Sequence, residues 1–249
     1  MKLIGAALRS AFTWSTALPL TFILAGIIWA TGTLRPDGTR ADKLTRTWGR
    51  SCLRLGGISL KVNGLENVDA STSYVVVSNH LSGFDIMAHF AAFPIPIRFL
   101  AKAELFKIPV FGGAMRTIGI VEVDRGAGRS IHEHINVTAT DAVAKGRSLI
   151  IYPEGTRPRD GVMQPFKKGA FTIATSMNLP VLPAAITGSR EVWAPGSKIL
   201  RPGKITVTIM PPISTVDMGL RDVENLRDRV HEQIQLVVQS TLCVGGNDS

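Results

Sequence analysis

Residues 74–85 read Tyr-Val-Val-Val-Ser-Asn-His-Leu-Ser-Gly-Phe-Asp and carry the clearest structural signal in the chain. The stretch begins with a β-branched apolar run, residues 74–77, of the kind that forms a strand buried on both faces. The polar pair Ser78-Asn79 ends this run, and an apolar segment begins after Asp85. The pattern predicts a strand, a short loop and a helix. It places His80 just beyond the carboxyl end of the strand, the edge where open α/β sheets bind ligands.

The spacing of His80 and Asp85 indicates a catalytic pair. Positions five apart do not share a helix face, but a loop that turns at Gly83 would fold Asp85 back toward His80. A carboxylate that accepts from one ring N–H fixes the tautomer and makes the other nitrogen more basic, so that it can deprotonate a hydroxyl. The residues alone leave a second interpretation open, in which Asp85 only caps the helix and His80 is a packed or surface residue.

The composition restricts the class of partner. Lys and Arg number 28 against 19 Asp and Glu, a net charge of +9, which implies a nucleic acid, an anionic lipid or a phosphorylated substrate. The chain has no nucleic-acid motif, and aromatic residues make up only 6% of it, which argues against nucleic acid. Cys52 and Cys243 are far apart and predict free thiols, and His132 and His134 face opposite sides of a helix. We therefore expect no metal site and no bound cofactor.

The N-terminal region predicts a membrane-anchoring segment. Residues 10–34 carry no charge and would span about 37 Å as one helix, enough for a bilayer core. Trp14 and Trp29 lie near its ends, like interface anchors. Pro19 and Gly26 interrupt the segment, so the sequence is compatible with a kinked helix or a shallow hairpin, either spanning the bilayer or lying in its interface. Residues 39–55 predict a basic amphipathic helix suited to an anionic membrane surface.

The rest of the chain alternates between strand and helix patterns, which predicts an α/β layered domain. We expect domain boundaries at 1–56 for the anchoring segment, 57–244 for the α/β domain and 245–249 for a short tail. The expected strands are 58–62, 74–77, 97–101, 118–123, 148–152, 181–187 and 205–210, and the expected helices are 86–93, 130–145, 170–177 and 221–242.

Several of these strands end in polar residues that suit a phosphorylated ligand. Asp124-Arg125 follows one strand, and Glu154-Gly155-Thr156-Arg157 follows another. Arg157 offers a planar fork for phosphate, Gly155 permits close backbone approach, and Thr156 offers a hydroxyl. Lys168 precedes a helix whose N-terminal N–H groups would add to an anion site. Each feature also has a structural explanation, since Arg125 and Lys168 would serve as surface charges and Glu154 could pair with Arg157.

Four blocks of the sequence resemble the PlsC-type glycerolipid acyltransferases. They are residues 79–85 (Asn-His-Leu-Ser-Gly-Phe-Asp), residues 119–125 with the preceding 102–105, residues 152–157 (Tyr-Pro-Glu-Gly-Thr-Arg) and residues 179–183. The first is similar to the family's HxxxxD motif, and the third is similar to its FPEGTR motif with Tyr152 in place of phenylalanine. The blocks occur in the family's order, which is far more specific than HxxxxD alone. The resemblance implies a central mixed sheet with flanking helices.

The resemblance also implies the reaction. It implies that a fatty acyl group passes from acyl-CoA or acyl-carrier protein to the 2-hydroxyl of 1-acylglycerol 3-phosphate and gives phosphatidic acid. His80 would be the base and Asp85 would orient its ring. The acceptor would be held by Lys102, Arg125, Glu154, Gly155, Thr156, Arg157 and Lys168. Lysophosphatidic acid, the acyl donor and the anionic bilayer are the expected partners, and a bacterial inner membrane is the expected location, with the catalytic domain on the cytoplasmic side.

Two alternatives remain at this point. The acceptor could be another lysolipid such as a lyso-ornithine lipid, or glycerol 3-phosphate, although two arginines favour a phosphorylated acceptor. The protein could instead be a non-catalytic binder of anionic lipid at the membrane surface. This second alternative accounts for the apolar segment and the charge, but it has no need of His80 and Asp85.

Overall fold

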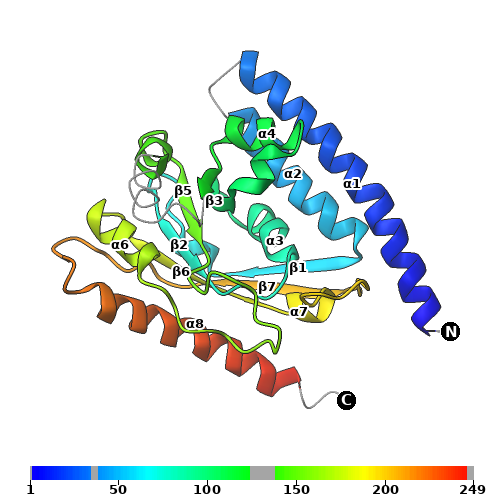
Figure 1. The fold of residues 1–249 in the computed structure, drawn as a ribbon. Helices are drawn as coiled ribbons and strands as arrows, with labels where there is room; N and C mark the ends of the chain where they lie inside the picture. Colours follow the sequence, from blue (N-terminus) through cyan, green and yellow to red (C-terminus); the bar gives the residue numbers. More distant parts are fainter. Residues whose placement is uncertain (1, 35–38, 124–137, 246–249) are drawn as a thin grey trace.

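The computed structural model describes residues 2–34, 39–123 and 138–245 and shows three layers, with helices on both faces of a central sheet (Figure 1). The seven strands lie in the order β1-β7-β6-β2-β5-β3-β4. Their bounds are β1 Ile58–Asn63, β2 Val75–Ser78, β3 Ile97–Lys102, β4 Val121–Val123, β5 Ser148–Ile151, β6 Val181–Thr187 and β7 Gly203–Ile209. The predicted α/β fold with a mixed sheet is confirmed.

The sheet is mixed because of a single antiparallel pairing. Strands β6 and β7 run in opposite directions, and every other neighbouring pair is parallel. The five strands β6, β2, β5, β3 and β4 therefore point the same way, and their carboxyl ends meet at one edge. The central strands β2, β5 and β6 are buried at every position, as their β-branched composition predicts.

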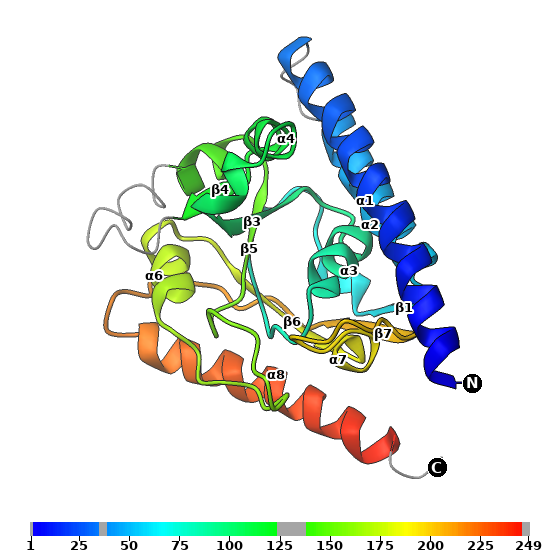
Figure 2. The same ribbon diagram turned by 45° about the vertical axis from the view of Figure 1, so that its right-hand side comes forward.

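Each face of the sheet is covered by its own set of helices, which pack around two separate apolar cores (Figure 2). One face carries α1 Lys2–Leu34, α2 Thr39–Leu55, α3 Phe84–Ala92, α4 Phe111–Ile118 and the short α7 Ser189–Val192. The other carries α6 Gly169–Ser176, α8 Val223–Gly245 and the helical residues 138–144. Two 3-10 turns, Leu65–Asn67 and Ala103–Lys107, complete the described elements.

The N-terminal segment is one helix that continues through Pro19, and α2 packs beside it (Figures 1 and 2). Residues Gly5–Gly32 are long and apolar enough to cross a membrane. The helix is nevertheless attached to the domain near both ends. Ser10 Oγ accepts a hydrogen bond from the Leu200 N–H at 2.8 Å, and a Cβ atom on Gly32 would lie only 1.9 Å from Cγ2 of Thr117 on α4.

The structure corrects one predicted element. The expected strand 118–123 begins later, because α4 continues to Ile118 and ends at Gly119, whose φ of 80° is the left-handed conformation that glycine adopts at helix ends. Of the expected helix 130–145, residues 138–144 are helical, and residues 130–137, with His132 and His134, lie outside the described residues. The domain boundary near residue 56 stays a prediction, with α2 ending at Leu55 and β1 beginning at Ile58.

Candidate active site

The loop between β2 and α3 brings His80 and Asp85 together. His80 Nδ1 lies 2.8 Å from Asp85 Oδ2. The same oxygen accepts the N–H groups of Leu81 at 2.7 Å and Ser82 at 2.8 Å, and the Asp85 side chain is fully buried. Because a carboxylate only accepts, the His80 proton is assigned to Nδ1, which leaves the lone pair on Nε2. The His80 side chain keeps 15% of its surface exposed, so the loop presents a fixed imidazole at the carboxyl edge of the sheet.

Tyr152 and His89 form a second layer beneath this pair. The rings of His80 and Tyr152 are stacked, with centroids 4.0 Å apart and planes 7° apart. The Tyr152 hydroxyl lies 3.1 Å from Nδ1 of His89, a fully buried residue of α3, and the same nitrogen lies 2.6 Å from the Asp85 carbonyl oxygen. Burial lowers the pKa of His89 to about 4, and burial also raises the pKa of Tyr152 well above its usual value. Both groups are therefore neutral at pH 7.

Glu154, the first polar residue beyond β5, is bound to the backbone. One carboxylate oxygen accepts the His80 N–H at 2.7 Å and the other accepts the Gln164 N–H at 2.9 Å. Its pKa is raised, mainly by burial and against those two hydrogen bonds. The sequence left open an ion pair between Glu154 and Arg157. In the structure the Glu154 carboxylate binds the backbone of His80 and so connects the end of β5 with the end of β2.

The predicted cationic residues have different surroundings. Thr156 and Arg157 are exposed, and a Cβ atom on Gly83 would lie 3.4 Å from Nη1 of Arg157, so this guanidinium lies beside the loop that carries His80 and Asp85. Lys102 is exposed at the end of β3, two strands from β2. Lys168 is also exposed and forms an ion pair with Glu224 of α8. Arg125 lies outside the described residues.

Ser82 and Cys52 carry groups that could act as covalent nucleophiles, but neither group is available in this structure. Ser82 is fully buried, and its hydroxyl donates to the Trp193 carbonyl at 2.8 Å and accepts the Phe84 N–H at 3.2 Å. Cys52 is 2% exposed, and burial raises the pKa of its thiol to about 11, so it is protonated at neutral pH. The described residues include no cluster of three or more His, Cys, Asp or Glu side chains with the geometry of a metal site.

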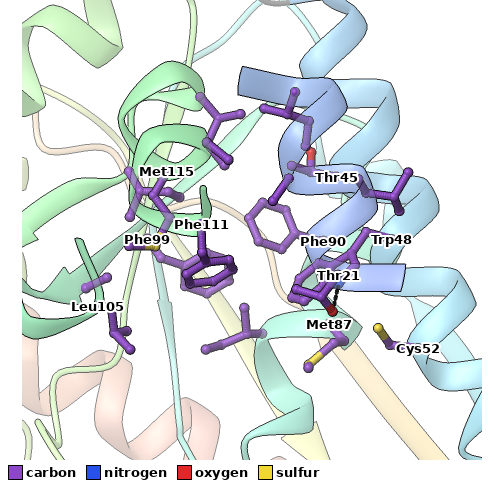
Figure 3. Close-up of a pocket in the computed structure, with 18 of the residues that line it drawn as sticks. Thr21, Thr45, Trp48, Cys52, Met87, Phe90, Phe99, Leu105, Phe111 and Met115 are labelled. Carbon is purple, nitrogen blue, oxygen red and sulfur yellow. Dashed lines mark hydrogen bonds between the residues drawn. The ribbon is translucent and has the colours of Figure 1, made fainter. Parts of the chain in front are cut away.

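An apolar cavity of about 330 Å³ lies under α1 on the same face of the sheet (Figure 3). Its wall includes side chains from α1, α2, α3, α4 and β3, among them Trp48, Phe90, Phe99, Phe111 and Met115. The few polar side chains in its wall bond to their surroundings: the Trp48 indole N–H donates to Thr21 Oγ1 at 2.9 Å, and the Thr45 hydroxyl donates to the Ala41 carbonyl at 3.1 Å.

Aromatic residues connect the cavity with the loop that carries His80 and Asp85. Phe84, which precedes Asp85, and Trp14 of α1 both line it. Both rings also contact Trp193, at centroid distances of 6.0 Å and 4.9 Å. Trp14, expected to anchor the helix at a membrane interface, therefore packs against the catalytic domain instead. Trp14 and Ile28 are 14 positions apart on α1, so the wall runs along about 21 Å of helix.

Sequence reasoning missed His89 and Trp193. His89 follows Asp85 by four positions in a helix, a spacing that places both on one face, and this was the available signal. For Trp193 the sequence offered no such signal, because only the tertiary structure brings its ring against Gly83. A Cβ atom on Gly83 would lie 2.6 Å from the Trp193 ring.

Comparisons with known proteins agree with this geometry. Residues 59–187 match the family model described as Acyltransferase. The chain is 38% identical over 178 residues to a chloroplastic 1-acyl-sn-glycerol-3-phosphate acyltransferase of Brassica napus, covering 71% of this chain and 51% of that protein. It is 30% identical over 196 residues to the human 1-acyl-sn-glycerol-3-phosphate acyltransferase alpha, covering 78% and 69%. The chain spans between half and two thirds of the length of several plant relatives.

Among solved structures, the chain is similar to the crystal structure of the 1-acyl-sn-glycerophosphate acyltransferase PlsC from Thermotoga maritima. The TM-score is 0.83 at 27% sequence identity, and the match covers 97% of this chain and 98% of that one. The family model spans more than half of this chain, including the residues that build the His80–Asp85 site. The chain therefore belongs to the PlsC-type acyltransferase family.

Proposed function

We propose that this protein transfers a fatty acyl group from acyl-CoA or acyl-carrier protein to the 2-hydroxyl of 1-acylglycerol 3-phosphate and forms phosphatidic acid. The observation that supports this reaction most strongly is the 2.8 Å contact between His80 and Asp85 at the carboxyl edge of the sheet. Phe84, next to Asp85 in the chain, lines the apolar cavity, and the exposed Arg157 lies beside Gly83 of the same loop. A base, an apolar chain site and a cation are the three elements that this transfer requires.

His80 is the proposed general base. With Nδ1–H donating to Asp85, Nε2 accepts the proton of the acceptor hydroxyl as its oxygen attacks the thioester carbonyl carbon. The new carbon–oxygen bond forms, the carbon–sulfur bond breaks, and the proton on Nε2 passes to the leaving thiolate. Asp85 stabilises the transient imidazolium and keeps the ring in the productive tautomer. The occupied hydroxyl of Ser82 and the protonated thiol of Cys52 favour this direct transfer over a covalent acyl-enzyme.

The Gly83 N–H is the proposed oxyanion donor. In the loop 81–85 the N–H groups of Leu81 and Ser82 bind Asp85 Oδ2, and those of Phe84 and Asp85 bind atoms of Ser82. This leaves the N–H of Gly83 as the loop donor available to the tetrahedral oxygen.

The apolar cavity is the proposed site for a fatty acyl chain. A wall about 21 Å long with almost no polar surface suits a long hydrocarbon chain and offers nothing to a polar ligand. Its wall includes Phe84, the residue before Asp85, so a chain that lies in the cavity would bring its carbonyl group near His80.

The acceptor is proposed to bind along the loop that follows β5. Strand β5 is the neighbour of β2, about 5 Å away, so Gly155, Thr156 and Arg157 lie next to the base. Lys102 follows β3, about 10 Å from β2, and would contact the acceptor only at its far end. Roles for Arg125 and Lys168 in binding the acceptor phosphate stay predictions from the sequence.

The membrane is proposed to contact the exposed face of α1. Phe12, Leu18, Ile23 and Trp29 are between 47% and 61% exposed on this helix. The opposite face is buried against the domain, from Ser10 to Ile28. A helix held along its length is not free to cross a bilayer, which favours a position of α1 in the interface. The cytoplasmic side stays the location that the sequence predicts for the catalytic domain. Lysophosphatidic acid and anionic lipids would then reach the site from the membrane surface.

The test is acyl transfer by the purified full chain in detergent, with acyl-CoA and lysophosphatidic acid as substrates and His80→Ala beside the wild type. We expect wild-type turnover and a loss of at least about a thousand-fold in kcat for the variant. Equal activity of the two proteins would overturn the role of His80.

Two further outcomes of the same assay bear on the alternatives. Turnover with lyso-ornithine lipid or glycerol 3-phosphate, and none with lysophosphatidic acid, would overturn the acceptor assignment. No turnover with either CoA or carrier-protein donors, together with tight binding of anionic vesicles, would favour a lipid-binding protein.

A further inference from the structure

Two adjacent lysines, Lys167 and Lys168, have opposite surroundings. The Lys168 ammonium is paired with Glu224 of α8, and this hydrogen bond is the main reason that the pKa of the Glu224 carboxyl is lowered. The Lys167 ammonium instead lies over Gly155, where a Cβ atom would be 2.8 Å from Nζ. Gly155 belongs to the Glu-Gly-Thr-Arg loop beside the base. Of these two cations, Lys167 is therefore the one at the active site.

The backbone around Lys167 is fixed to this loop. The Lys167 N–H donates to the Pro153 carbonyl at 3.0 Å. Three residues earlier, the Gln164 N–H donates to Oε2 of Glu154 at 2.9 Å, and the other oxygen of that carboxylate accepts the His80 N–H at 2.7 Å. Residues 164–167 thus run alongside residues 153–155. Only Glu154 separates the backbone of this segment from the backbone of His80.

Gly155 makes room for the Lys167 side chain. Its φ of 77° is a conformation that residues with a side chain rarely adopt. The missing side chain also leaves space that Cδ, Cε and Nζ of Lys167 occupy, at 3.7, 3.4 and 2.8 Å from the position of a Cβ atom. The ammonium therefore lies directly on the backbone that the acceptor approaches.

Lys167 and Arg157 carry charges that no carboxylate of the described residues neutralises. Within the described part of the chain, neither side chain forms an ion pair with a carboxylate. The one acid of the loop, Glu154, already accepts two backbone N–H groups. Both cations are exposed and flank the same loop, Arg157 toward Gly83 and Lys167 over Gly155. A phosphate monoester carries a charge of about −1.5 to −2 near pH 7, which matches two cations.

We propose that Lys167, together with Arg157, binds the phosphate of the lysophospholipid acceptor, and that Lys168 has no part in this. The inference rests on the proposed acyl transfer and names a binding residue for its acceptor. Lys168 pairs with Glu224 of α8 instead.

The neighbouring lysines provide a matched pair of variants. Lys167→Ala should raise the KM for lysophosphatidic acid about ten-fold or more, with kcat and the KM for acyl-CoA changed by less than about three-fold, because one charged contact is worth about one decade in affinity. Lys168→Ala should leave both KM values within about two-fold of the wild type. Lys167→Arg should retain most of the affinity. With 1-acylglycerol, which lacks the phosphate, Lys167→Ala and the wild type should perform alike.

A binding measurement separates this inference from the proposed reaction. In the His80→Ala background, the dissociation constant for lysophosphatidic acid in detergent is measured by equilibrium dialysis with and without Lys167→Ala. A ten-fold weakening supports the phosphate contact even if no acceptor is turned over, in which case only the proposed reaction fails. Equal effects of Lys167→Ala and Lys168→Ala, or a rise confined to the KM for acyl-CoA, would overturn the role of Lys167 while leaving the acyl transfer intact.

Discussion

The imidazole of His80 lies flat on the phenol ring of Tyr152, with the two planes 7° apart. Because Asp85 fixes only one edge of the imidazole, this stacking holds the plane of the ring and therefore the direction of Nε2. An aromatic pair contributes about 0.5–1.5 kcal/mol beyond the contribution of its buried area.

The stacking of His80 on Tyr152 can be tested by substitution. Tyr152→Leu should lower kcat by up to about ten-fold. Tyr152→Phe should keep kcat within about three-fold, because it retains the ring and loses only the hydroxyl contact to His89. Steady-state rates at saturating substrates decide this, and an equal loss in both variants would contradict the stacking role.

Glu154 should act as a positioning residue rather than as a contact to the acceptor. Both carboxylate oxygens of Glu154 accept a backbone N–H group. In Glu154→Gln one of these oxygens becomes an NH2 group, which cannot accept, so one of the two hydrogen bonds that hold the loop at the His80 backbone is lost. We expect kcat to fall roughly ten-fold or more, and the KM for the acceptor to stay within about two-fold. Glu66→Gln, at an exposed position, is the control. A larger change in KM than in kcat would instead favour the substrate contact that the sequence predicted.

His89 should make the folding stability depend on pH. Its pKa is lowered from 6.5 to about 4, so the unfolded chain binds the proton more readily than the folded one. The stabilisation is fully present above about pH 6.5. It decreases as the pH falls below that value and is lost near pH 4, a total of about 3 kcal/mol. Urea unfolding of the wild type and of His89→Gln at pH 7 and pH 4.5 measures this. Between these two pH values the pH dependence of the free energy of unfolding should be smaller in the variant by about 2.5 kcal/mol. An unchanged pH dependence would contradict the burial of a neutral imidazole.

Ala25, on α1, should influence the length of the acyl chain. Its side chain is 4% exposed and lines the cavity 11 positions beyond Trp14, about 16 Å farther from the catalytic loop. Ala25→Leu would fill that end of the cavity, so activity should shift toward shorter acyl-CoA donors or acceptors, with little loss for the shortest. Ala11→Leu, an exposed position on the same helix, should leave the preference unchanged. Competition between acyl-CoA species of different length measures the shift, and parallel losses at all lengths would exclude this role.

The ion pair of Asp42 with Arg98 should hold the helices α1 and α2 to the sheet. Arg98, on β3, is 1% exposed and lies 2.5 Å from Oδ1 of Asp42 on α2. Asp42→Ala leaves a buried guanidinium without its carboxylate and should lower the free energy of unfolding by about 3–5 kcal/mol. Asp141→Ala breaks an exposed pair with Lys145 and should cost less than about 1 kcal/mol. Urea unfolding in detergent compares the two, and similar losses would contradict the prediction.

The sequence predicts strands, strand ends and tight loops well where the residues of that same short segment determine them. The β-branched run before His80 predicts β2, and the polar residues after β2 and β5 predict the edge at which the site lies. The fold of Asp85 back onto His80 follows from the loop at Gly83. In all three cases the signal lies within a few residues of the feature, so no knowledge of the tertiary structure is needed.

What the sequence does not predict depends on contacts between distant segments. Lys167 and Lys168 are equivalent in sequence, and only the placement of α8, which brings Glu224 to one of them, distinguishes the two. Strand β7 enters the sheet between β6, which precedes it directly in the order of strands, and β1, which lies about 140 positions earlier in the chain, and no local signal predicts this pairing with β1. Likewise, the two tryptophans of α1 look alike as interface anchors, yet Trp14 packs against Trp193, which lies 179 positions later in the chain.

Because α1 supplies seven of the residues around the apolar cavity, the helix proposed to face the membrane is also part of the proposed substrate site. Deleting residues 1–34 to obtain a water-soluble fragment would remove one wall and open the remaining apolar lining to solvent. Such a fragment should aggregate, and any portion that stays dispersed should have lost its selectivity for long chains. Solubilisation by truncation and retention of activity are therefore incompatible aims for this protein, and its enzymology requires the intact chain in detergent or lipid.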